Sequence, residues 1–492
     1  MTLSASETRI VITGAMVVLF LAALEQTIVA TALPSIANSL GGFDLLSWVV
    51  TIYLLTATCA TLVLGKLSDM YGRRIVLNAC IVTFLAASVL CAVADSMIML
   101  IAARALQGLG GGGLMTLSHA TVGDAVPPRE RGRYAGYFAT VWATASLLGP
   151  TLGGFLTEYA GWRWVFWINL PIGLAGLLIT DRVMRRLPQQ HRKSHIPYAD
   201  IALFVAGSMS FMLALTWGGS AFAWTDPRVL GGFALSIVCS WMFFRRQGVS
   251  AQPILPPGFL KDAVIGPTLV AAFLAFGVYI VMAVLPPTYF QLALGAPASQ
   301  VGLLMIPLLL SATIGALVSG RAVTWTGNYK QPPAIGLPLA VLALAILAWE
   351  AEAISPLAAS VLMAFVGAGI GTFFPVSMTA VQNAVDPADM GAVTGALGFS
   401  RSLGGAVAVA AASALLLSLI AAWVPGAGHI EGLQDLVRQP LDEAERVAIA
   451  QAFGVLFAAL AGVLLLCLAV FSRVAGRELR SGAVDAAGEG AE

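Results

Sequence analysis

Two ionisable residues stand inside long apolar stretches of this 492-residue chain, where they could carry proton chemistry. Glu25 is the one carboxylate that we place in the middle of an expected membrane span, and Arg104 lies inside another. An acid in hydrocarbon must face a cavity or pair with a cation, and it can then exchange protons near neutrality. Arg104 keeps its proton, so it needs an acceptor such as Glu25, a helix backbone or a substrate. We predict that both residues take part in proton coupling; the alternatives are a structural ion pair, a hydrogen bond between Glu25 and Gln26, or an arginine that reaches the membrane surface.

The second stretch that could do chemistry is a charged loop, GKLSDMYGRR, at positions 65–74 between two apolar runs. Its glycines let the backbone turn tightly. Asp69 can meet the positive end of a following helix or an arginine of the same loop, a contact that can form in one conformation and break in another. The loop is therefore predicted to control a conformational change, unless it is a solvated turn that only orients the chain. Its candidate gating residues are Gly65, Asp69, Gly72, Arg73 and Arg74.

This loop has a degenerate copy in the second half of the chain. In SGRAVTWTGNYK (319–330), Gly320 and Gly327 repeat the spacing of Gly65 and Gly72 at an offset of 255, with Thr324 in place of Asp69. A second triplet, Pro128, Gly132 and Gly136, recurs as Pro387, Gly391 and Gly395 at an offset of 259. Two such similar offsets predict one duplicated unit. Duplicated apolar halves are typical of secondary transporters, in which two bundles move about a central site.

Composition places these residues in a membrane protein. The chain is 59% hydrophobic and 10% charged, more apolar than a soluble core can use. A net charge of +1 argues against nucleic acid as a partner. The five cysteines lie in apolar runs without a C-x-x-C pair, so we expect no metal site, cofactor or disulfide. The N-terminus lacks a cleavable signal pattern, so its first apolar run is predicted to be a retained span.

Fourteen stretches are long and apolar enough to be membrane helices, so the predicted fold is an all-α integral membrane protein with 14 transmembrane helices. The expected ranges are 10–33, 46–64, 75–94, 97–122, 134–157, 164–181, 199–218, 229–244, 264–286, 301–319, 334–349, 355–378, 391–421 and 449–472. Of the 26 lysines and arginines, 20 fall on the side of both termini and four on the other. The excess of cations marks the cytoplasmic side, so both termini are predicted to be cytoplasmic, in a bacterial inner membrane.

The repeat divides this chain into two pseudo-repeated six-helix bundles with a two-helix insertion. The expected units are the N-terminal bundle (1–181), a basic cytoplasmic loop with inserted helices (182–250), the C-terminal bundle (251–472) and a disordered cytoplasmic tail (473–492). An outer loop, about 423–446, is expected to contain a small amphipathic helix.

Five motifs in order resemble the fourteen-span drug:proton antiporter branch of the major facilitator superfamily. They are LEQTIVATALPSI (24–36), with Glu25 where that branch usually has Asp, the 65–74 loop, RALQGLGGGG from Arg104, LLGPTLGG (147–154) and WRWVFWINLPIG (162–173). The resemblance covers nearly the whole chain. It implies alternating access and export of amphipathic drugs in exchange for protons.

The fifth expected helix holds a cluster of helix-shaping residues, Gly149, Pro150, Gly153 and Gly154. They are predicted to bring this helix into close backbone contact and to kink it, acting between the two bundles and not on a ligand.

A further set of polar and aromatic residues is predicted to line a substrate cavity, although aromatic side chains in spans more often face lipid or core. The candidates are Gln26, Tyr53, Gln107, Trp142, Tyr279, Phe374, Asn383 and Arg401. Arg401 is a cation in the second bundle where the repeat has Trp142; it either recognises an anionic or polar substrate or is solvated near the cytoplasmic end.

The leading hypothesis is a monomeric secondary transporter whose partners are a small molecule, protons and the lipid bilayer. The expected spans contain one buried carboxylate and two buried arginines, and this balance of charge favours neutral or anionic aromatic compounds over cationic drugs. The alternative within transport is therefore a carrier for a specific metabolite or vitamin, for example one for riboflavin uptake. A non-transporting membrane sensor or scaffold is the hypothesis of another class. The H-x-x-x-x-D spacing of His119 and Asp124 lacks other catalytic groups, so no enzyme is predicted, and no P-loop for ATP is present.

Overall fold

A computed structural model describes residues 5–42, 45–185, 196–219, 221–250, 252–424, 442–477 and 479. Within these residues the regular secondary structure is helical, apart from one isolated bridge between Gly218 and Phe222, and short turns and loops connect the helices. The helices are α1 (Ala5–Leu40), α2 (Leu46–Tyr71), α3 (Arg73–Ala92), α4 (Met97–Ala125), α5 (Pro128–Tyr159), α6 (Trp164–Trp167), α7 (Asn169–Met184), α8 (Tyr198–Trp217), α9 (Pro227–Gln247), α10 (Pro257–Lys261), α11 (Ile265–Val284), α12 (Pro286–Leu292), α13 (Ala298–Thr326), α14 (Gln331–Trp349), α15 (Pro356–Gly371), α16 (Phe373–Asn383), η2 (Pro387–Asp389), α17 (Met390–Trp423) and α19 (Glu443–Ser472).

The all-helical membrane fold is confirmed, with 13 described helices long and apolar enough to span a bilayer. Each of the fourteen expected ranges falls on helix. The one expected span that is not among these thirteen is α5, because threonine, serine and glycine dilute its apolar residues and charges crowd its first turns. Parts of three expected features lie outside the described residues: 186–195 of the basic loop, 425–441 of the outer loop, and 480–492 of the tail.

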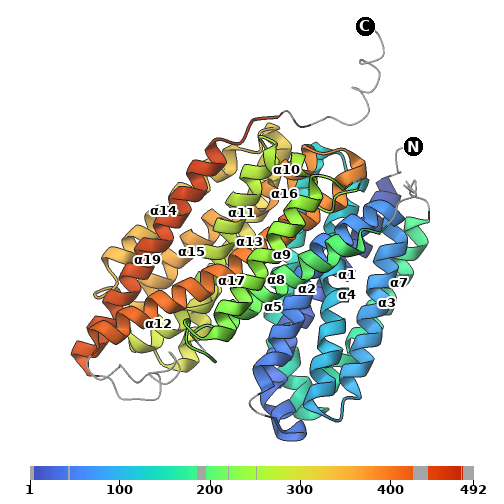
Figure 1. Cartoon of the computed structure of the whole chain (residues 1–492). Coiled ribbons are helices and arrows are strands. Elements are labelled where there is room, and N and C mark those ends of the chain that lie inside the picture. Colours follow the sequence, from blue (N-terminus) through green and yellow to red (C-terminus); the bar gives the residue numbers. More distant parts are fainter. Residues whose placement is uncertain are drawn as a thin grey trace.

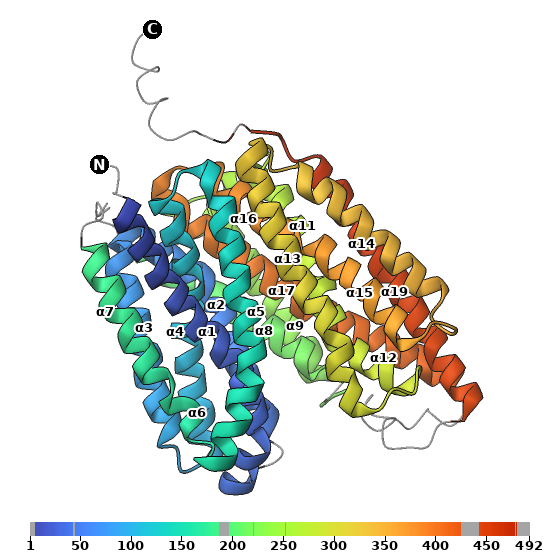
Figure 2. The same ribbon diagram turned by 180° about the vertical axis from the view of Figure 1, so that it is seen from behind.

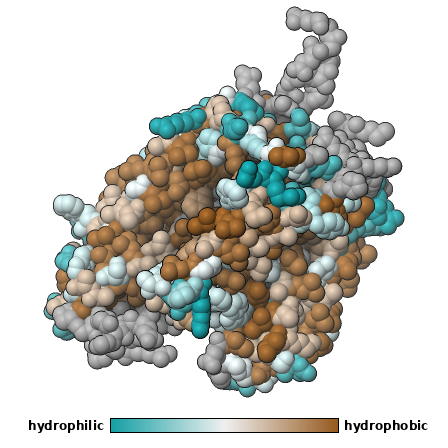
Figure 3. All heavy atoms as spheres, in the orientation of Figure 1, coloured by the Kyte–Doolittle hydropathy of each residue, from teal (hydrophilic) through white to brown (hydrophobic). Residues whose placement is uncertain are grey.

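The helices form two groups that lean together at one end and diverge toward the other (Figures 1 and 2). One group contains α1–α7 and the other α11–α19; the start of α1 and the end of α19 lie at the end where the groups meet. The α8–α9 pair packs mainly against itself, beside α2 and α17. The face shown in Figure 3 is largely apolar, with hydrophilic residues gathered mainly toward the two ends.

The two groups meet through two pairs of helices, α2 with α17 and α5 with α13. Gly65 of α2 packs against the backbone of Gly391 in α17, and a Cβ on either would overlap the other's carbonyl oxygen. In the same way, Gly132 of α5 packs against Gly320 of α13. These four glycines are the residues that the sequence offsets of 255 and 259 pair with one another. The two interfaces therefore use positions that the predicted repeat makes equivalent: the first half supplies Gly65 to one interface and Gly132 to the other, and the second half supplies Gly391 and Gly320.

The glycines in the middle of α5 do not lie between the two groups, which corrects the sequence-based expectation. Gly149 and Gly153 pack against Thr27 and Thr31 of α1, in the same group of helices. Gly154 has open space around it, and Pro150 is exposed. The sequence could show that α5 needs a close neighbour, but several helices could have supplied it.

Alanine substitutions within α5 should separate these glycine environments. A methyl group at Gly149 would overlap the Thr27 hydroxyl, so we expect Gly149→Ala to destabilise the protein by about 1–3 kcal/mol. The matched change Gly154→Ala meets no atom within 4 Å and should be neutral, or stabilise α5 by up to about 1 kcal/mol. Thermal unfolding of the two purified variants measures the difference. Equal losses would contradict the packing of α5 on α1.

Candidate functional site

A buried ion pair between Glu25 of α1 and Arg104 of α4 lies inside the first group of helices. Both side chains are essentially inaccessible, at 0% and 1% exposed. The guanidinium Nη1 of Arg104 donates to Glu25 Oε1, and its Nε donates to the carbonyl of Val49 at 3.0 Å. Arg104 therefore uses two of the three acceptors that the sequence suggested, the carboxylate and a helix backbone.

A polar network surrounds this pair and satisfies its remaining atoms. Asn169 of α7 donates to Glu25 Oε2 at 2.5 Å, and Arg104 Nη1 donates to Gln107 Oε1 at 2.7 Å. Ser88 of α3 accepts from both Gln107 Nε2 (2.8 Å) and Asn169 Nδ2 (3.2 Å). Side chains from four helices thus contribute to one buried network, in which Asn169 Oδ1 has no partner among the described residues. Because each member is fully buried, removing any one leaves polar groups without partners.

Tyr53 and Gln107 belong to this network region and do not line a cavity between the two groups, contrary to the sequence-based expectation. The Arg104 guanidinium lies over the Tyr53 ring, with 4.3 Å between Cζ and the ring centroid. Tyr53 is 1% exposed, and its hydroxyl is buried without a partner among the described residues. Glycine run 110–113 of α4 allows this packing, since a Cβ on Gly111 would lie 2.5 Å from the Tyr53 hydroxyl.

Arg401 of α17 forms a second polar site, in the other group of helices. Its Nη2 donates to the carbonyl of Phe374 and to Ser377 Oγ, each at 2.7 Å. Its Cζ lies 5.7 Å from the Phe374 ring centroid, and Tyr279 meets that ring edge-on at 5.3 Å. No carboxylate pairs with Arg401 in the described part of the chain, and its Nε is buried without a partner there. Arg401, Phe374 and Tyr279 are half-buried, so the structure brings three of the predicted cavity residues together.

The other three cavity candidates lie apart from this site. Gln26 is half-buried, and its Nε2 contacts the Met115 sulfur at 3.7 Å. Trp142 is a half-buried neighbour of two hydrophobic clusters. Asn383 is 5% exposed at the end of α16.

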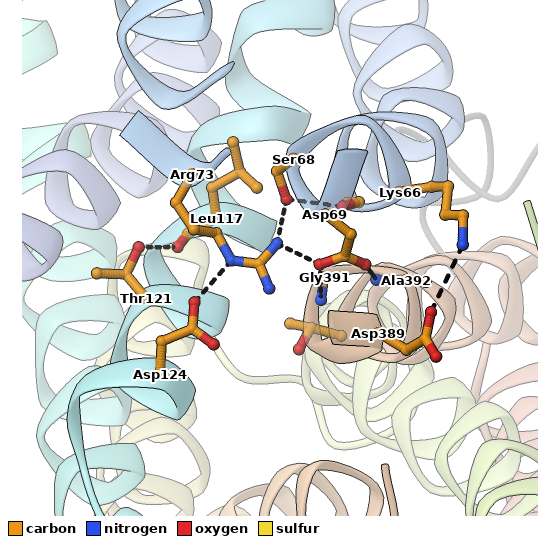
Figure 4. Close-up of polar contacts among 12 residues, drawn as sticks. Lys66, Ser68, Asp69, Arg73, Leu117, Thr121, Asp124, Asp389, Gly391 and Ala392 are labelled. Atoms are coloured by element: carbon orange, nitrogen blue, oxygen red, sulfur yellow. Dashed lines mark hydrogen bonds and ion pairs between the residues drawn. The ribbon is translucent and has the colours of Figure 1, made fainter. Parts of the chain in front are cut away.

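Asp69 joins the two groups of helices at the end where they meet (Figure 4). Its Oδ1 and Oδ2 accept from the backbone amides of Gly391 (2.9 Å) and Ala392 (2.7 Å), at the start of α17. The same carboxylate pairs with Arg73 Nη1 at 2.6 Å. Asp69 thus meets the expected arginine of its own loop, but the positive helix end that it meets belongs to α17 and not to the following helix α3. Helix α17 lies more than 320 residues away in the sequence.

We call the contacts of Asp69 with Arg73, Gly391 and Ala392 the Asp69 latch, and further ion pairs lie beside it. Arg73 Nε pairs with Asp124 at 2.8 Å, and Lys66 pairs across the interface with Asp389 at 3.5 Å (Figure 4). Arg74 pairs with Asp181 of α7 at 2.8 Å, within the first group. Gly72, at φ +91°, allows the sharp turn between α2 and α3.

Sequence reasoning missed several of these partners. Asn169 was available as the one amide inside the apolar WRWVFWINLPIG segment, and Asp389 as the repeat equivalent of Glu130. Ser88 and Asp181 carry no comparable signal, because single polar residues in or near spans are common.

Comparisons with known proteins identify the family of this chain. A family model described as Major Facilitator Superfamily matches residues 15–409. The multidrug transporter protein MdtP of Bacillus subtilis (strain 168) is 33% identical over 412 residues, covering 84% of this chain and 76% of the relative. Multidrug resistance protein 3 of the same organism is 31% identical over 399 residues, covering 81% and 78%.

Solved structures share the fold at low identity. The proton:xylose symporter XylE bound to 6-bromo-6-deoxy-D-glucose aligns with a TM-score of 0.65 at 13% identity, covering 97% of this chain and 98% of that one. A bacterial homologue of the iron transporter ferroportin in an outward-facing state aligns with a TM-score of 0.64 at 14% identity, covering 95% and 98%. At these identities the likeness concerns the fold alone.

Proposed function

The chain belongs to the major facilitator superfamily, and on that premise we propose that it is a proton-coupled exporter of small aromatic or amphipathic molecules. It is a multi-pass membrane transporter whose relatives include multidrug transporters. Export, proton coupling and the substrate class are our proposals; export rests on the likeness to multidrug transporters, and the other two rest on the polar sites described above.

The observation that carries proton coupling is the buried pair of Glu25 and Arg104. Arg104 keeps its charge, so the charge on this site changes only when Glu25 gains or loses a proton. While Arg104 and Asn169 contact the carboxylate, they stabilise its ionised form. A conformational change that withdraws either contact favours protonation, because an unpaired carboxylate is costly in an apolar interior. Proton uptake and helix movement are thereby linked.

Alternating access follows from the two interfaces between the groups of helices. We propose 14 spans, with α5 as the fourteenth, in bundles at 1–181 and 251–472, an insertion at 182–250 and a tail at 473–492. The pairing of Gly65 with Gly391 and of Gly132 with Gly320 supports this repeat. With both termini in the cytoplasm of a bacterial cell, the Asp69 latch closes the cytoplasmic side. The described conformation is then the outward-open one, of a monomer in the inner membrane.

The substrate class is inferred from Arg401 and its aromatic neighbours. A cation beside Phe374 and Tyr279, with no carboxylate paired to it among the described residues, favours neutral or anionic aromatic compounds. The alternative within transport is a carrier for one metabolite or vitamin, such as a riboflavin importer, because the same site would accept a flat heterocycle. A sensor or scaffold is the less supported hypothesis, since the relatives named above are transporters.

Transport by inside-out membrane vesicles tests the proposal directly. We expect vesicles that contain the protein to accumulate a neutral or anionic aromatic dye when respiration acidifies their lumen, and to release it on addition of a protonophore. Vesicles that contain the Arg401→Gln variant should no longer accumulate that dye, while their accumulation of a permanently cationic dye should equal that of the wild type. Accumulation of riboflavin by intact cells, without dye transport in the vesicles, would overturn export in favour of uptake.

A further inference from the structure

The α5–α13 interface contains a positively charged pocket at the end of the molecule where the two groups of helices meet. It has a volume of about 220 Å³ and is lined by Arg133 and Tyr137 of α5 and by Arg321, Thr324 and Trp325 of α13. Arg133 Nε donates to the Tyr137 hydroxyl at 3.0 Å. Neither arginine is in an ion pair with a carboxylate of the described chain. The pocket thus presents two exposed guanidinium groups, one from each half of the protein.

The repeat explains why an anion is missing here. Lys66, Asp69, Arg73, Asp124 and Asp389 of the α2–α17 interface correspond to Arg321, Thr324, Asn328, Asn383 and Glu130. Two acids are therefore replaced by neutral residues, and Arg133 adds a cation where the first interface has Ala392. The first interface has one excess negative charge, and the second has one excess positive charge. Glu130 does not compensate both arginines, since it forms no ion pair with either in the described structure.

The surroundings of the pocket are those of a membrane interface. Trp325, at the end of α13, is 78% exposed, and Trp349, at the opposite end of the following helix, is 87% exposed. Exposed tryptophans at both ends of a helix pair mark the two headgroup layers. From Arg321 toward the membrane centre, the same face of α13 carries Val318, Ile314 and Leu310, which are 59%, 58% and 50% exposed. This exposed apolar stripe begins at Val318, one helical turn from Arg321 of the pocket.

We propose that this pocket binds the phosphate headgroup of an anionic glycerophospholipid, with an acyl chain along the exposed stripe of α13. The headgroup bridges Arg133 and Arg321, because guanidinium groups bind phosphate through paired, charge-assisted hydrogen bonds. It supplies between α5 and α13 the negative charge that Asp69 supplies between α2 and α17. Since the lining residues come from both halves, a bound lipid stabilises the conformation in which this end is closed.

Native mass spectrometry of the full-length protein, released from nanodiscs, tests the site. In discs of phosphatidylcholine with added phosphatidylglycerol, we expect the wild type to retain at least one more phosphatidylglycerol than Arg133→Gln/Arg321→Gln. The two single variants, one from each helix, should each raise the half-saturating lipid fraction by about tenfold. A matched control, Arg245→Gln/Arg473→Gln, removes two exposed cations outside the pocket and should bind like the wild type. Equal loss in this control would overturn the site in favour of general charge attraction.

Two further measurements test whether the pocket binds a whole phospholipid or any phosphate group. Thr324→Asp places a carboxylate in the pocket, so it should remove the extra phosphatidylglycerol without any loss of arginine. Inorganic phosphate should not displace the lipid at millimolar concentration, because it lacks an acyl chain for the α13 stripe. Displacement by inorganic phosphate, or unchanged lipid binding in Thr324→Asp, would overturn the lipid site. These readouts are independent of transport, so the site can fail while the proposed function holds.

Discussion

Glu25→Gln is expected to abolish proton-driven transport while leaving a folded protein in the membrane. The variant cannot lose a proton at this position, so the charge of the site no longer changes during the cycle. It also leaves Arg104 buried without its counter-ion, and breaking a buried ion pair in this way costs about 3–5 kcal/mol. Dye accumulation in inside-out vesicles measures the first effect, and thermal unfolding of the purified protein measures the second.

Matched variants separate coupling from stability. Glu158→Gln removes an exposed carboxylate at the end of α5 and should leave both readouts unchanged. The double variant Glu25→Gln/Arg104→Gln removes both charges, so it should recover stability relative to Glu25→Gln without recovering transport. Normal proton-driven accumulation by Glu25→Gln would remove Glu25 from the coupling mechanism. The pair would then be a structural ion pair only.

The long helices could be predicted from the sequence because a membrane span needs about 20 apolar residues in a row. All fourteen expected ranges fall on helix, and α5 shows the limit of that criterion. The pairing of Glu25 with Arg104 was also within reach, since a buried acid and a buried base in one bundle have few other partners. Of the two residues that complete the network, Asn169 stands out as the one amide of its apolar segment, whereas Ser88 gave no signal because single serines in spans are common.

The direction in which a side chain points was the least predictable property. Tyr53 and Tyr279 are both aromatic residues of apolar helices, yet one lies under Arg104 and the other beside Phe374 and Arg401. A membrane-spanning helix is apolar on every side. The periodicity of its hydrophobic residues therefore does not distinguish the face that lines a cavity from the face that packs against other helices. The prediction for the glycines of α5 was wrong for the same reason. The sequence indicated that they need a close helix neighbour, but it did not indicate that this neighbour is α1.

Asp69→Asn should weaken the closed state at the end where the two groups meet. The carboxylate accepts two backbone amides of α17 and pairs with Arg73, and hydrogen bonds to a charged group contribute about 1.5–3 kcal/mol. Losing about 2 kcal/mol would shift the equilibrium between the two conformations roughly 30-fold toward opening of this end. Turnover in vesicles should fall by at least about tenfold, while substrate affinity changes little, because Asp69 lies at the latch and not beside Arg401.

Spin labels at Ile75→Cys in α3 and Ile335→Cys in α14 can measure this shift. Both positions are exposed near this end of the molecule, one in each group of helices, whereas the native cysteines are buried. Asp69→Asn should add a longer label-to-label distance that is rare in the wild type. The control Asp389→Asn breaks only the longer and more exposed pair with Lys66, whose worth is about 0–1 kcal/mol, so its distances should stay close to the wild type. Unchanged distances and turnover in Asp69→Asn would mean that the loop is a topological turn, and that other contacts between the two groups hold this end closed.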